Sequence, residues 1–96
     1  MKDILVTGGS QGIGLEFTRQ YLHRGCRVFA ASRKPEESEP LQQLQVQYDD
    51  QLAIHQLDVA DEGSRANFFQ VLAAEIEKLD VLINNAGVIS GNEQFS

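Results

Sequence analysis

A glycine-rich turn near the amino terminus constrains the fold of this chain most. Residues 7–14 read T-G-G-S-Q-G-I-G; they follow the apolar run 4–6 and precede a stretch with helical spacing. Glycine lets a backbone approach an anion without a Cβ in the way, and the N–H groups that open a helix point toward that anion. The segment therefore predicts a strand, a tight turn and a helix that together hold a phosphate group, with a dinucleotide diphosphate as the expected ligand.

Strand and helix patterns alternate along the rest of the chain. Apolar residues recur at helical spacing from Ile13 to Leu22, and Gly25 is a stop signal of the kind found beyond helix ends. Asp61 is expected to cap a later helix. After the first helix, the expected elements are a strand at 27–32, a weaker helix at about 36–47 with its start blurred by Pro40, a strand at 52–57, a helix from 61 to about 78, and a strand at 81–83.

This alternation predicts an α/β fold, a Rossmann-type three-layer parallel sheet with the strand order 3-2-1-4. In that order the carboxyl ends of the first and fourth strands border one crevice, where ligands bind in open α/β sheets. We expect residues 1–87 to form the amino-terminal part of an NAD(P)-binding Rossmann domain. Residues 88–96 form a polar tail that we expect to be poorly ordered.

Composition excludes several classes of partner. The net charge of −6 argues against nucleic acid, because binding a phosphate backbone requires a basic face. No apolar run approaches the roughly 20 residues that cross a bilayer, so we expect no membrane partner. The first residues lack the apolar core of a secretory signal, and a cytoplasmic location follows. The single cysteine, Cys26, has no disulfide partner and no metal-ligand spacing, and no metal site is predicted.

Two motifs carry a resemblance to a known family. The glycines Gly8, Gly12 and Gly14 depart from G-x-G-x-x-G, but T-G-x-x-x-G-x-G resembles the cofactor motif of the short-chain dehydrogenase/reductase family. A second motif of that family, N-N-A-G, stands at 84–87 after an apolar run. Residues 12–16 and 28–33 are most similar to its C-factor and sniffer-type carbonyl reductase branch. Glycines alone would also fit a tight turn without a ligand.

The resemblance implies a set of cofactor-binding residues. Asp58 and Val59 look like the family's adenine contacts, although Asp58 can also serve to satisfy loop N–H groups. Residues 84 and 85 can likewise tie neighbouring strands together through their amides. The implied set is Gly8, Ser10, Gln11, Gly12, Ile13 and Gly14 in the turn, Ser32 and Arg33 after the second strand, Asp58 and Val59 after the third, and Asn85, Ala86 and Gly87 beside the nicotinamide ribose.

The residues after the second strand favour NADP(H) over NAD(H). NAD-binding folds place an Asp or Glu there to bind the ribose hydroxyls, whereas this chain has Ser32, Arg33 and Lys34. A carboxylate would repel a 2′-phosphate, while a hydroxyl and a guanidinium can bind it. The alternative is that Arg33 and Lys34 are a solvated pair in a loop.

No catalytic residue is predicted in these 96 residues. The family transfers a hydride between carbonyl and alcohol with a Tyr and a Lys four residues later. Here Tyr21 and Tyr48 are followed at that spacing by Gly25 and Leu52. The resemblance therefore implies the cofactor-binding half of an oxidoreductase that is inactive by itself. The alternative is a non-enzymatic module that binds a dinucleotide or another protein.

The fourth strand predicts self-association. In the full family fold this strand is central, whereas in this chain residues 81–84 would form a sheet edge with unpaired backbone groups. We therefore expect the chain to pair with itself through this edge, in a symmetric dimer or by exchange of a segment.

Overall fold

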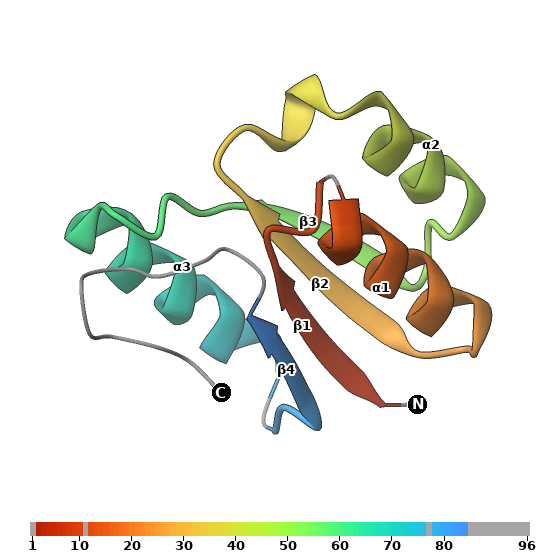
Figure 1. The fold of residues 1–96 in the computed structure, drawn as a ribbon. Helices are drawn as coiled ribbons and strands as arrows, with labels where there is room; N and C mark the ends of the chain where they lie inside the picture. Colours follow the sequence, from red (N-terminus) through yellow and green to blue (C-terminus); the bar gives the residue numbers. More distant parts are fainter. Residues whose placement is uncertain (1, 11, 77, 85–96) are drawn as a thin grey trace.

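The computed structural model describes residues 2–10, 12–76 and 78–84, which form four strands, three α-helices and one 3₁₀ turn (Figure 1). Their order along the chain is strand β1 (Asp3–Thr7), helix α1 (Gly12–His23), strand β2 (Arg27–Ser32), 3₁₀ turn η1 (Pro35–Glu37), helix α2 (Glu39–Gln47), strand β3 (Leu52–Gln56), helix α3 (Glu62–Glu75) and strand β4 (Val81–Asn84). No described helix has both the length and the apolar character that a membrane crossing requires.

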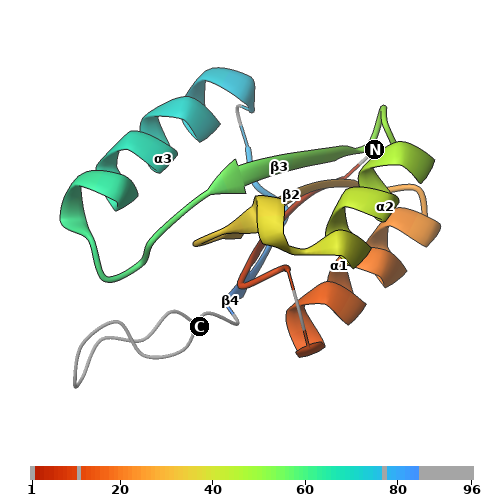
Figure 2. The same ribbon diagram turned by 90° about the horizontal axis from the view of Figure 1, so that it is seen from above.

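The strands form one parallel sheet in the order β3-β2-β1-β4, which confirms the predicted fold class and strand order. Leu5 lies in register with Phe29 on β2 and with Leu82 on β4. Helices α1 and α2 cover one face of the sheet and α3 covers the other, as the view from above shows (Figure 2). Because all strand pairs are parallel, the carboxyl ends of the four strands point to the same edge of the sheet.

Alternate residues of the central strands feed two separate hydrophobic clusters. Ile4 and Val28 pack toward α1 and α2, where Leu22 and Leu41 complete the cluster. The alternate strand residues Leu5, Phe29 and Ala31 face α3 instead, and they form the second cluster with Leu57 and with Phe68 and Leu72 of α3. Because β1 and β2 are buried on both faces, they read as continuous apolar runs. Strand β3, at the side of the sheet, is only half-buried over most of its length.

Two predicted helix bounds are wrong. The stretch predicted as one helix from 36 is divided, because Ser38 is extended (φ −95°, ψ 99°) and acts as the N-cap of α2. Pro40 then occupies the first turn of α2, a position that tolerates proline. Helix α3 ends at Glu75 rather than at about Lys78, because Ile76 becomes extended and packs with the cluster under α3. The predicted Asp61 cap and the Gly25 stop (φ 85°) are confirmed.

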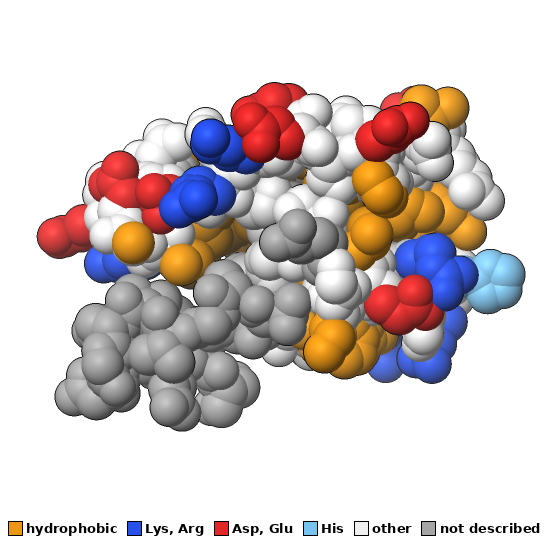
Figure 3. Space-filling view, turned by 45° about the horizontal axis from the view of Figure 1, so that its top comes forward, with side chains coloured by type: hydrophobic (Ala, Val, Ile, Leu, Met, Phe, Trp, Pro, Cys, Tyr) orange, Lys and Arg blue, Asp and Glu red, His pale blue; other side chains and the backbone are white. Residues whose placement is uncertain are grey.

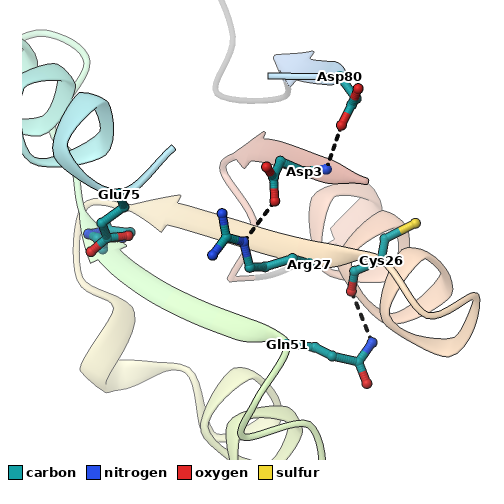
Figure 4. Close-up of polar contacts among 7 residues, drawn as sticks. Asp3, Cys26, Arg27, Gln51, Glu75 and Asp80 are labelled. Carbon is teal, nitrogen blue, oxygen red and sulfur yellow. Dashed lines mark hydrogen bonds and ion pairs between the residues drawn. The ribbon is translucent and has the colours of Figure 1, made fainter. Parts of the chain in front are cut away.

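A polar network joins the amino ends of the three neighbouring strands (Figure 4). The Arg27 Nε donates to Asp3 Oδ1 at 2.7 Å, so that β2 is tied to β1. Asp3 N in turn donates to Asp80 Oδ2 at 2.8 Å, and Asp80 N donates to Asp3 O at 2.9 Å. These contacts fix the register of β1 with both neighbours at the edge opposite the carboxyl ends.

Candidate functional site

A cavity of about 790 Å³ lies at the carboxyl ends of β1, β2 and β3. Its walls come from the loops that follow these strands, so segments far apart in the sequence meet there. The residues of the predicted cofactor set that line it are Gly8, Ser10, Gly12, Ser32, Arg33, Asp58 and Val59. Gln11, Asn85, Ala86 and Gly87 lie outside the described residues, as does the predicted tail.

The glycine turn owes its shape to two positions. Gly12 begins α1 with φ 59°, a left-handed conformation in which a Cβ would meet nothing within 4 Å. Glycine is favoured at this position because of the left-handed backbone conformation, since a larger side chain would have room. Gly9 is required for the opposite reason, because a Cβ there would lie 3.2 Å from Ala30 Cβ and 3.2 Å from Thr18 Oγ1. The turn therefore packs directly on β2 and α1.

The amino end of α1 faces this cavity. The first N–H groups of an α-helix have no acceptor within the helix, and they carry the positive end of its dipole. Gly12 and Leu15 line the cavity, and the first turn of α1 contains no acidic residue. The Ile13 side chain is 66% exposed and Gly14 is buried, and neither lines the cavity. Any contribution of these two residues to an anion site is limited to backbone N–H groups.

One carboxylate stands near this helix end and is compensated. Glu16 accepts hydrogen bonds from Arg19 and from Gln20 Nε2, the latter at 2.8 Å. The hydrogen bond from Arg19 is the main cause that lowers the pKa of the Glu16 carboxyl. Because both side chains are exposed, this pair matters for local charge more than for stability.

The end of β2 places an unpaired hydroxyl beside two cations. Ser32 is only 7% exposed, and its Oγ has no hydrogen-bond partner among the described residues. Arg33 and Lys34 follow it with exposed side chains that line the same cavity. Lys34 Nζ lies 3.9 Å from Glu37 Oε2, a weak ion pair. A buried polar atom without a partner is uncommon and calls for an explanation, such as a functional role or a bound water or ion.

Asp58 has the structural role that the sequence left open. Its Oδ1 accepts a hydrogen bond from Ala60 N at 3.0 Å, and its own N–H donates to Ser64 Oγ at 2.9 Å. The loop after β3 is thereby held against the first turn of α3. Asp58 and Val59 also line the cavity, so a structural role does not remove them from the site.

Two polar side chains of the cavity were missed by sequence reasoning. Ser38 Oγ donates to the Ser10 carbonyl in the glycine turn, and Glu37 adds a carboxylate to the wall. The sequence held a signal for Ser38, because a serine two residues before Pro40 is typical of a helix start. Nothing in the sequence indicated its contact with Ser10, which depends on how α2 packs.

On the face shown in Figure 3, acidic and basic side chains lie next to one another. Within the described residues, no group of three His, Cys, Asp or Glu side chains is arranged to hold a metal ion. His55 Nε2 lies 3.5 Å from Glu75 Oε2, outside this cavity. The described polar groups of the site are therefore a helix end, several hydroxyl groups and a few single charges.

Comparisons with known proteins agree with this geometry. A family model described as short chain dehydrogenase matches residues 2–96. The chain is 38% identical over 90 residues to NADP-dependent 3-hydroxy acid dehydrogenase YdfG of Escherichia coli, covering 94% of this chain and 35% of that protein. It is 40% identical over 88 residues to (+)-neomenthol dehydrogenase of Arabidopsis thaliana, covering 88% of this chain and 30% of that protein. The chain thus spans about a third of the length of these relatives.

The fold is also similar to solved structures. The structure of a carbonyl reductase from Pseudomonas aeruginosa PAO1 in complex with NADP superposes with a TM-score of 0.84 at 33% identity, covering 96% of this chain and 41% of that one. This neighbour fits the carbonyl reductase branch that the motifs resemble. The family model, the relatives and the fold agree, and the chain belongs to the short chain dehydrogenase family.

Proposed function

We propose that this chain binds NADP(H) in the cavity at the carboxyl ends of β1 to β3, as the cofactor-binding part of an oxidoreductase that acts on carbonyl or alcohol groups. The bound cofactor would supply or accept a hydride. The residues of the chain do the binding: the glycine turn and the first turn of α1 hold the diphosphate, Ser32 and Arg33 bind the 2′-phosphate, and Asp58 and Val59 hold the adenine.

The glycine turn suits a diphosphate for two reasons. A Cβ at Gly12 would point into open space, so the backbone is bare where the ligand would approach. The unpaired N–H groups of α1 add a positive dipole end without adding a charged side chain. This matters in a chain with a net charge of −6, which repels an anion at long range.

The observation that carries the proposal is the Ser32 hydroxyl. Ser32 lines the cavity, and its buried hydroxyl has no hydrogen-bond partner within the described part of the chain. A 2′-phosphate beside it would accept its proton and pair with the guanidinium of Arg33. A carboxylate at this place would favour the free ribose hydroxyls of NAD(H) instead.

The relatives support this choice. The Escherichia coli relative is named NADP-dependent, and the carbonyl reductase neighbour contains NADP. These proteins are longer than this chain, so the hydride transfer itself is proposed for the whole protein. We expect no carbonyl reduction from the 96 residues alone, because neither Tyr21 nor Tyr48 has a lysine four residues later. Metal-independent turnover by the purified chain would contradict this expectation and place the reaction on other residues.

Arg33→Ala tests the proposal without disturbing the core, because the Arg33 side chain is exposed. Calorimetric titration should give about tenfold weaker binding of NADP⁺ and less than a twofold change for NAD⁺, as expected for loss of a charge-assisted hydrogen bond. Arg24→Ala is the matched control, because Arg24 is also exposed but lies over Tyr21 at the far end of α1. Equal losses for both cofactors, or none, would contradict recognition of the 2′-phosphate.

Three coarser features belong to the same proposal. We place the cofactor-binding unit at residues 1–87 and keep the cytoplasm as its expected compartment.

We also propose self-association through β4, which in the described sheet pairs with β1 alone and leaves Leu82 36% exposed. Sedimentation velocity should then show association that rises with concentration and is reduced by Leu82→Lys, since an edge charge opposes strand pairing. A single monomer species at high concentration would refute it.

A further inference from the structure

One hydrogen bond joins the two parts of the cavity that would bind phosphate groups. Ser38 Oγ donates to the Ser10 carbonyl, a contact between residues 28 apart in the sequence. Both residues line the cavity. The same oxygen accepts from Leu41 N at 3.3 Å and so caps α2. The Ser38 hydroxyl therefore donates one hydrogen bond and accepts another, and only the one that it donates contacts the glycine turn.

The loop at residues 33–38, which we call the 33–38 loop, is firmly attached to α2. Ser38 N donates to the Pro35 carbonyl at 3.1 Å, and Gln42 Nε2 donates to the same carbonyl at 2.9 Å. Helix α2 is itself anchored in the core by Leu41, which is fully buried. The position of this loop is thus set by α2, and the Ser38 contact adds a hydrogen bond from the loop to the glycine turn.

We propose that Ser38 is a positioning residue that fixes the distance between the glycine turn and the 33–38 loop. The inference rests on the proposed function, in which the turn holds the diphosphate and Arg33 binds the 2′-phosphate. A ligand that contacts both the glycine turn and the 33–38 loop binds only when these two segments are at the right distance. If that distance is already fixed in the free protein, less conformational entropy is lost on binding. A ligand that touches only the 33–38 loop gains nothing from the contact with Ser10.

The test compares two ligands in variants of the full chain. NADP⁺ spans both parts, whereas adenosine 2′-phosphate has no diphosphate and reaches only the adenine and 2′-phosphate side. Ser38→Gly removes the donor but disturbs the α2 cap by only a few tenths of a kcal/mol. It should weaken NADP⁺ binding about five- to tenfold and change adenosine 2′-phosphate binding less than twofold. Ser38→Thr keeps the hydroxyl and should restore NADP⁺ binding.

Gln51→Ala controls for a general loss of rigidity. Gln51 Nε2 also makes long-range contacts, to Leu22 O at 3.0 Å and Cys26 O at 2.9 Å, but at the opposite edge of the sheet (Figure 4). We expect this variant to lose stability without changing the ratio of the two affinities.

The outcomes separate the inference from the function on which it rests. If the unsubstituted chain binds neither ligand, the proposed function fails and the inference fails with it. If the chain binds both ligands and Ser38→Gly weakens both equally, the inference alone is overturned and Ser38 is only a helix cap. The same holds if Gln51→Ala changes the affinity ratio as much as Ser38→Gly does.

Discussion

Replacing Gly12 by alanine separates the binding role of the glycine turn from its role in the fold. Gly12 has φ 59° and opens α1 at the cavity wall, where an added Cβ would touch no neighbouring atom. Gly25 has φ 85° just beyond the other end of the same helix, and a Cβ there would also meet nothing within 4 Å. The two substitutions therefore impose the same kind of backbone strain at opposite ends of α1.

The expected loss of stability is similar for both variants. Holding an L-residue in the left-handed region costs about 1–2 kcal/mol. In a domain of this size each kcal/mol lowers the melting temperature by about 4–8 °C. Binding should differ: a methyl group at Gly12 moves the anion away from the N–H groups of α1, and a hydrogen bond to a charged group is worth about 1.5–3 kcal/mol. We expect Gly12→Ala to weaken NADP⁺ binding about 10- to 100-fold and Gly25→Ala to leave it unchanged.

Thermal denaturation followed by circular dichroism measures the first effect, and calorimetric titration with NADP⁺ measures the second. Titration well below the melting temperature of either variant keeps both chains folded during the binding measurement. The reasoning is refuted if the two variants lose stability alike and still bind NADP⁺ alike. In that case the glycines of the turn serve chain reversal alone, and the ligand lies elsewhere.

The remaining predictions concern one charge in the cavity, one ion pair and one packing contact. Glu37→Gln frees Lys34 from its ion pair and removes a negative charge from the cavity, so calorimetry should give about two- to fivefold tighter NADP⁺ binding with NAD⁺ unchanged; weaker NADP⁺ binding would oppose it. Asp3→Asn weakens the contact with Arg27 and should reduce the free energy of unfolding in urea by about 1 kcal/mol; an unchanged midpoint would contradict it. Gly9→Ala overfills the turn and should reduce that free energy by about 1–3 kcal/mol; a loss below 0.5 kcal/mol, about the size of a neutral surface change, would count against it.

Much of the fold could be predicted because burial leaves a direct trace in the sequence. Strand β2 occupies Arg27–Ser32, the predicted range, since a strand covered on both faces must be apolar throughout. The Asp61 cap was predictable for a local reason, because its carboxylate accepts from N–H groups only two and three residues away. Both features leave a signal within a short stretch of the sequence.

The predicted helix bounds were wrong where tertiary contacts determine the start or the end of a helix. The two faces of helix α3 differ little in hydrophobicity, so no periodic pattern marks where the helix ends. It ends before Ile76, which is extended and packs against the hydrophobic core. The start of α2 is set by Ser38, whose hydroxyl bonds at the same time to a carbonyl 28 residues earlier. Ser32 was identified by type and position, but only the structure gives its burial and its unpaired Oγ.

The carboxyl end of β2 organises most of the cavity through its backbone. The Ala31 carbonyl accepts from Gly8 N at 2.7 Å, which places the glycine turn. The next carbonyl, that of Ser32, accepts from Leu57 N at 2.7 Å, which places the start of the loop after β3. Both loops are thus tied to one strand whose register is fixed along its length. Among the described residues, no backbone hydrogen bond joins the 33–38 loop to the turn, and the side chain of Ser38 makes the connection instead.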